Sequence, residues 1–151
     1  MIIDSQVHAY EANTPKRPWH AAPNWPPHVT GDEMCAAMDK VGVDGAIFIS
    51  AFSLYHYDAS YAVEVQKAHP DRMAIVKPVD PDDPAVADVV ADWKRTPGAV
   101  AIRIMLTKEA NREPTDPGEG SRPCGISGIR GRASSLGAFA RHADGWRVLR
   151  L

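Results

Sequence analysis

The sequence predicts an α/β protein that forms the first four βα units of a (β/α)₈ TIM barrel, followed by an irregular C-terminal tail. Short apolar runs alternate with segments of helical spacing, which is typical of parallel strands with helices packed outside them. The turn after the first strand contains no glycine, and this favours a barrel over an open, doubly wound sheet. The alternation stops near residue 108, so only a partial barrel is predicted.

The first strand is expected at residues 2–8, and a long loop rich in tryptophan and proline follows it. A loop of that length is unusual unless it has a function. Thr30 and Glu33 have the spacing of a capping box, which predicts the start of the first helix. Gly42 is expected to end that helix.

The same alternation continues along the chain. A second helix is expected to begin at Asp58 or Ser60, and a third at Asp83, where an N-cap residue precedes a proline. Apolar runs predict the remaining strands at residues 46–49, 73–76 and 100–106.

Composition excludes several classes of function. A formal net charge of −2 gives no basic field for a phosphate backbone, so no nucleic acid partner is expected. No apolar run approaches the roughly 20 residues that cross a bilayer, so no membrane segment is expected. The N-terminus lacks the pattern of a signal peptide, and two distant cysteines do not make a disulfide framework. These features predict a cytoplasmic protein with a small-molecule substrate.

A change in composition divides the chain into two predicted domains, residues 1–108 and 109–151. The first has ten basic and fourteen acidic residues, whereas the second has seven arginines, no lysine and five acidic residues. Seven of the eleven glycines also lie in the second part, where hydrophobic periodicity is lost. Two interpretations remain open: a disordered tail, or the product of a reading-frame shift near residues 109–120.

The first strand carries the residues with the clearest chemistry. Because side chains alternate along a strand, Asp4, Gln6 and His8 are expected to share one face. In a barrel this polar face would point inward at the C-terminal mouth, where barrel enzymes carry out their reactions. A histidine there can bind a metal or transfer a proton, although His8 could also be a core residue bonded to a carbonyl.

The run Ile3-Asp4-Ser5-Gln6-Val7-His8 resembles the Asp-x-His-x-His start of the amidohydrolase superfamily. It is most similar to the amidohydrolase-related branch, which includes lactone hydrolases and metal-dependent decarboxylases. The order of the later segments agrees, and the resemblance covers about residues 1–108. It implies a hydrolase that activates water against a lactone, an amide or a similar carbonyl bond.

Two departures from the family pattern bear on metal binding and activity. Gln6 stands where the family has a first histidine, and an amide is a poor zinc ligand. A divalent, zinc-like metal on His8 would therefore be held weakly, or this branch works without a metal; Gln6 would then orient or hydrogen-bond a neighbour. The family's later-strand ligands have no match here, so the chain is expected to be truncated and weakly active or inactive.

The remaining candidate residues could contact substrate, and for Arg103 and Trp19 a structural role is also open. Arg103 could act in catalysis by binding a substrate carboxylate or an oxyanion, or it could form a structural salt bridge with Asp4. His56 is expected to contact substrate, as is Asp4. Trp19 could line a substrate pocket or pin the loop to the barrel.

Two further functions compete with hydrolysis. The chain could be a non-catalytic barrel fragment, or a small α/β binding module that uses the aromatic loop. A half-barrel also leaves two open strand edges, and open edges invite pairing between chains. A homo-oligomer formed through these edges is therefore expected as an alternative to a monomer.

Overall fold

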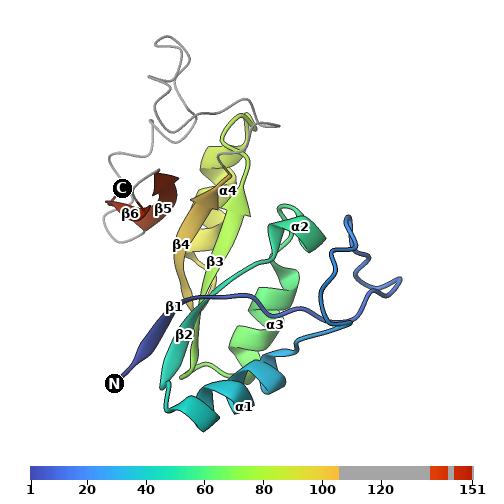
Figure 1. Ribbon diagram of the computed structural model, residues 1–151. Coiled ribbons are helices and arrows are strands. Elements are labelled where there is room, and N and C mark those ends of the chain that lie inside the picture. The colour runs from blue at the N-terminus through green and yellow to red at the C-terminus, as the bar shows by residue number, and fades with distance from the viewer. Residues whose placement is uncertain (106–136, 143–144, 151) are drawn as a thin grey trace. The chain divides into compact units, whose positions relative to one another are not determined.

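The structure is a computed structural model that describes residues 1–105, 137–142 and 145–150. Up to β4, strands alternate with helices, which is the predicted α/β pattern (Figure 1). The elements in chain order are β1 (Ile3–Val7), α1 (Gly31–Val41), β2 (Gly45–Ile49), α2 (Phe52–Tyr55), α3 (Ser60–Ala68), β3 (Met73–Val79), α4 (Val86–Lys94), β4 (Ala99–Ile104), β5 (Gly137–His142) and β6 (Gly145–Arg150).

The chain divides into two compact units. The first comprises Met1–Pro78 and Thr96–Ala99, and the second comprises Val79–Arg95 and Val100–Leu151. This division follows the packing of the elements, whereas the predicted boundary at residue 108 follows the change in composition. That boundary stays a prediction, since the segment around it lies outside the described residues.

The first unit contains a parallel sheet in the order β1-β2-β3. β2 and β3 pair without interruption from Ala46 opposite Met73 to Ile49 opposite Val76. β1 and β2 are also parallel, but their register shifts between Asp4 and Val7. All three strands therefore end at the same edge of the sheet, and the irregularity lies in the strand that carries the candidate chemistry.

The predicted capping box at the start of α1 is confirmed. Thr30 Oγ1 accepts a hydrogen bond from the Glu33 backbone N–H at 3.2 Å, and Glu33 Oε2 accepts one from the Thr30 N–H at 2.7 Å. Gly42 ends the helix in the left-handed region, with φ 74°, as predicted. Local sequence thus fixes both ends of α1.

Helices α1 and α3 lie side by side (Figure 1), and a glycine permits their close approach. A Cβ atom at Gly31 would lie only 2.6 Å from Cγ1 of Val65 on α3. The Gly31 N–H also donates to the hydroxyl of Tyr61 at 3.2 Å. The Tyr61 ring in turn meets Phe48 of β2 edge to face, with centroids 6.3 Å apart. This contact joins α3 to the sheet.

Two helices differ from the sequence predictions. The single-turn helix α2 was not predicted, and it has no side-chain cap that the sequence could reveal. For α4, the predicted N-cap at Asp83 is wrong, because the cap residue is Ala85. Asp83 instead accepts a hydrogen bond from the Ala85 N–H at 2.8 Å, so it closes a turn just before the helix.

The second unit contains α4 and a sheet in the order β4-β5-β6. Trp93 of α4 is buried, and its indole N–H donates to the Ala101 carbonyl of β4 at 2.9 Å. β5 is parallel to β4, and β6 is antiparallel to β5. Both β5 and β6 lie within residues 109–151, for which an irregular tail was predicted.

Candidate functional site

His8 follows directly after β1 and is bound to the next strand. Its Nδ1 lies 2.8 Å from the carbonyl oxygen of Ile49, the last residue of β2. A carbonyl can only accept a hydrogen bond, so Nδ1 must carry a proton and donate it. The half-buried imidazole is thereby fixed in orientation, and in its neutral form Nε2 carries the lone pair.

Gln6 meets this second nitrogen of His8. The amide Nε2 of Gln6 lies 3.4 Å from Nε2 of His8, and both side chains are half-buried. Since an amide nitrogen is a donor, the contact is consistent with a lone pair on the histidine nitrogen. The two side chains form a short polar pair at the carboxyl end of β1. Such a pair can accept a proton at His8 while Gln6 holds the ring in place.

Asp4 lies where the pairing of β1 is irregular. The register between β1 and β2 shifts between Asp4 and Val7. The exposed Asp4 carboxylate accepts the backbone N–H of Gln6, two residues further along the chain, at 3.0 Å. This bond stabilises the irregular backbone just before Gln6. A role of Asp4 in substrate binding stays a prediction.

The donor set around His8 does not fit a resident metal ion. Within the described residues, no three histidine, cysteine, aspartate or glutamate side chains gather closely enough to hold one. The imidazole nitrogen that would bind the metal faces the amide nitrogen of Gln6, which has no lone pair to offer. Among the residues that the structure describes, the metal suggested by the family resemblance therefore has no set of ligands around His8.

The long loop between β1 and α1 is anchored by the buried Arg17. Its guanidinium donates to Oε1 of Glu11 at 2.5 Å, to Oε1 of Glu64 at 3.0 Å and to Oγ of Ser60 at 3.1 Å. The same group lies 5.2 Å from the ring centroid of Tyr61. These contacts raise the pKa of Arg17 against the opposing effect of burial, and they tie the loop to α3.

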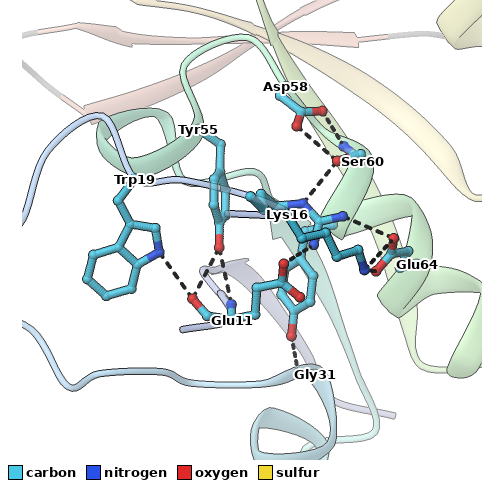
Figure 2. Close-up of polar contacts among 10 residues, drawn as sticks. Glu11, Lys16, Trp19, Gly31, Tyr55, Asp58, Ser60 and Glu64 are labelled. Carbon is cyan, nitrogen blue, oxygen red and sulfur yellow. Dashed lines mark hydrogen bonds and ion pairs between the residues drawn. The ribbon is translucent and has the colours of Figure 1, made fainter. Parts of the chain in front are cut away.

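Trp19 lies against the same loop. Its indole N–H donates to the Glu11 carbonyl at 3.1 Å, and the hydroxyl of Tyr55 is bonded to the backbone of Glu11 as well (Figure 2). The Trp19 ring also meets Tyr10 edge to face, with centroids 5.8 Å apart. These contacts give Trp19 an anchoring function; its predicted contact with substrate remains a prediction.

His56 lies beyond α2 and has an unusual backbone. Its φ of 48° is the only positive φ of a non-glycine residue in the part of the chain that the structure describes. Its ring stacks on that of His20 from the long loop, with centroids 3.9 Å apart. Sequence reasoning proposed His56 as a substrate contact but missed its pairing with His20, since no local pattern links residues 36 positions apart.

Arg103 lies on β4, in the second unit. Its side chain is half-buried, and it shares a strand face with the buried Ala101. This part of β4 belongs to the second unit, whereas His8 and Gln6 belong to the first. The two predicted roles, binding of a carboxylate or oxyanion and a salt bridge to Asp4, both stay predictions.

Comparison with known proteins gives a likeness to solved structures. No family model matches the chain, and no curated protein matches it either. One similar solved structure is that of a probable 2-pyrone-4,6-dicarboxylic acid hydrolase from Acinetobacter baumannii with citric acid bound. The TM-score is 0.55 at 16% identity, and the match covers 70% of this chain and 40% of that one.

This likeness supports the fold class and shows how much of a complete barrel the chain covers. Together with the βα alternation, it shows that the chain has the architecture of a partial (β/α)₈ barrel. The chain spans well under half the length of the hydrolase that it resembles. Among the described residues, no helix has the length and apolar character needed to cross a bilayer.

Proposed function

We propose that the first unit carries part of a hydrolase site, built at the carboxyl end of β1, for a lactone, an amide or a similar carbonyl bond. The observation that carries the proposal is the fixed orientation of His8, whose Nδ1 is bonded to Ile49 while Nε2 faces Gln6. Three further features support it: the resemblance of β1 to the amidohydrolase start, the barrel architecture, and a structural neighbour that is named as a hydrolase.

The chemistry follows from the lone pair on His8 Nε2. As water attacks the carbonyl carbon, a new C–O bond forms and the water proton passes to Nε2. The bond to the leaving alkoxide or amine then breaks, and His8 returns the proton to that group. Gln6 would donate its amide N–H to the imidazole or to the attacking water and so keep them aligned. The role predicted for Arg103, a cation for an oxyanion or for a substrate carboxylate, stays a prediction.

The site proposed here is incomplete within the described residues. The neighbour is matched over only 40% of its length, and a barrel site draws residues from the ends of several strands. We therefore propose that the chain alone turns over substrate weakly or not at all, and that a polypeptide supplying the later strands would complete it. The proposal includes a cytoplasmic location and self-association through the open strand edges.

A second candidate is a binding module that uses the long loop. The hydrogen bonds of the buried Arg17 to Glu11 and Glu64 favour this function. They order the loop before a ligand binds and so lower the entropic cost of binding. If this alternative holds, substitutions of His8 or Gln6 would not change the affinity of the loop for its ligand.

Turnover assays separate these candidates. The purified chain would be incubated with a panel of lactones, including 2-pyrone-4,6-dicarboxylic acid, alone and with a polypeptide that supplies the later strands of the barrel. We expect turnover to be near background for the chain alone and to rise on complementation, and His8→Asn to abolish that rise. His28→Asn is the matched control, since His28 is an exposed histidine bonded to Glu33 at 3.0 Å. Turnover that survives His8→Asn would refute the proposed site.

A further inference from the structure

The most distinctive unassigned feature of the first unit is a stack of three rings. The rings of His20 and His56 lie 3.9 Å apart and within 9° of parallel. The His56 ring also stacks on that of Phe52 of α2, with centroids 5.3 Å apart and planes inclined by 25°. The His20 backbone N–H donates to the Leu54 carbonyl at 2.9 Å, so the long loop is fixed to α2 where the stack forms. The backbone therefore determines that the two imidazoles meet.

The turn that presents His56 is strained. The Asp58 N–H donates to the Tyr55 carbonyl at 2.9 Å, which closes a four-residue turn with His56 at its first central position. Its φ of 48° and ψ of −119° are those of a type II′ turn, in which this position is normally glycine. A side chain retained there costs conformational free energy, and such costs concentrate at functional sites.

Both imidazoles are exposed, and their nitrogens are available to a ligand. Within the described residues, no side-chain or backbone group forms a hydrogen bond to a ring nitrogen of His20 or His56. Each neutral imidazole offers one N–H, and each protonated imidazole offers two. Because the two rings are stacked with nearly parallel planes, an N–H group of one ring can act beside an N–H group of the other.

The charged groups next to this turn favour an anion. The ammonium group of Lys77 donates to the Tyr57 carbonyl at 2.8 Å, which places a cation beside the turn. The nearby carboxylate of Asp58 is occupied by Ser60, whose backbone N–H and hydroxyl it accepts at 2.8 and 2.9 Å. The Asp58 carboxylate is thus engaged at the start of α3, and the Lys77 ammonium lies at the carbonyl of Tyr57, the residue after His56.

We propose that His20 and His56 together bind an oxyanion, a carboxylate or a phosphate, with one ring N–H from each imidazole donating to its oxygens. Two donors on adjacent, stacked rings can bind the paired oxygens of such a group, and a charge-assisted bond forms wherever an imidazole is protonated. The proposed site uses neither His8 nor Gln6, and it does not require that the chain hydrolyse anything. It also explains why a histidine, and not a glycine, stands at the strained position of the turn.

Binding is tested by following the imidazole Cε1–H resonances of the full chain by NMR at mildly acidic pH. Succinate, inorganic phosphate and chloride would be titrated separately at matched ionic strength. We expect saturable shifts of the His20 and His56 resonances with succinate, with phosphate or with both, and none with chloride. The two oxyanion arms then identify which kind of group the pair prefers. Equal shifts with chloride would overturn the proposal.

Matched variants show whether the imidazole nitrogens are responsible. His20→Phe retains a stacked ring but removes its nitrogens, so it should weaken oxyanion binding about tenfold. His28→Phe changes an exposed histidine outside the stack and should leave the affinity unchanged. His56→Gly relieves the positive φ, so it should keep the fold, as its amide spectrum would show, while losing the site. Unchanged affinity in His20→Phe or in folded His56→Gly would refute the proposed pair.

Discussion

The guanidinium of Arg17, in the long loop, donates through Nη2 to Oε1 of Glu64 on α3 at a distance of 3.0 Å. The Arg17 side chain is only 7% exposed, whereas that of Glu64 is 49% exposed. With Glu11 and Ser60, this pair forms the main polar anchor of the loop. The order of the loop therefore depends on an arginine that has been removed from water, and three partners compensate for that removal.

Arg17→Met should consequently destabilise the protein by about 2 kcal/mol, because it removes the buried cation that bonds both Glu11 and Glu64. Urea unfolding measures the loss, and proteolysis within residues 11–29 reports the freed loop. Lys16→Met is the control, since Lys16 bonds the same Glu64 at 3.3 Å but is 65% exposed. It should cost less than about 0.5 kcal/mol. Equal effects of both substitutions would show that burial of Arg17 contributes nothing.

The Arg17–Glu64 pair should also make stability depend on acid. Burial alone would raise the pKa of Glu64, but the hydrogen bond and the charge from Arg17 outweigh it, so that this pKa lies below its ordinary value. A carboxylate with a lowered pKa stabilises the fold above its unfolded pKa, and this contribution is lost as the pH falls to roughly 4 and below.

Glu64→Gln should therefore be less stable than the unmodified protein at neutral pH, and its stability should fall less steeply on acidification. Denaturant unfolding at a series of pH values measures both slopes. If the two proteins lose stability in parallel as the pH falls, then Glu64 is not a source of the acid sensitivity.

The contact between α1 and α3 makes a prediction about packing. In Gly31→Ala the new methyl group would overlap Val65, which lies 2.6 Å from the position of that Cβ. We expect a loss of about 1–3 kcal/mol, as is usual when a packed interface is overfilled. The double variant with Val65→Ala should recover part of this loss, which a double-mutant cycle of unfolding free energies detects. Simple additivity of the two changes would contradict the proposed clash.

These contacts also mark how far sequence reasoning could reach. The ends of α1 were predictable because Thr30, Glu33 and Gly42 act on neighbouring backbone groups. Apolar runs located β2, β3 and β4, since burial of a parallel strand is visible in its own residues. The first strand was also located, but the irregular register within it was not, because that shift depends on pairing with β2.

Contacts across long stretches of chain could not be predicted. Arg17 and Glu64 are 47 positions apart, and no local sequence pattern links them. The same holds for the stacked rings of His20 and His56, which meet only because the loop returns to α2. The predicted polar pair of β1 had a local basis, since Gln6 and His8 are two residues apart. The Ile49 carbonyl, which orients His8, is again distant in sequence.

The identity of residue 6 should control metal binding. Gln6 presents an amide nitrogen to Nε2 of His8, and an amide is a poor ligand for zinc. Gln6→His would place a second imidazole beside the first, so its affinity for Zn²⁺ should exceed that of the unmodified chain by at least about tenfold. Equilibrium dialysis against Zn²⁺ measures the difference, with Gln66→His as the control at another glutamine. Equal affinity in the Gln6→His variant and the unmodified chain would contradict this assignment.

The tautomer of His8 is the most direct test of the proposed chemistry, since proton transfer requires a lone pair on Nε2. Long-range ¹H–¹⁵N correlation spectra of the ¹⁵N-labelled protein distinguish the two ring nitrogens at neutral pH. The account predicts a protonated Nδ1, bonded to the Ile49 carbonyl, and an unprotonated Nε2 whose shift changes in Gln6→Leu. A neutral ring with the proton on Nε2 would contradict it, because His8 could then accept no proton from an attacking water.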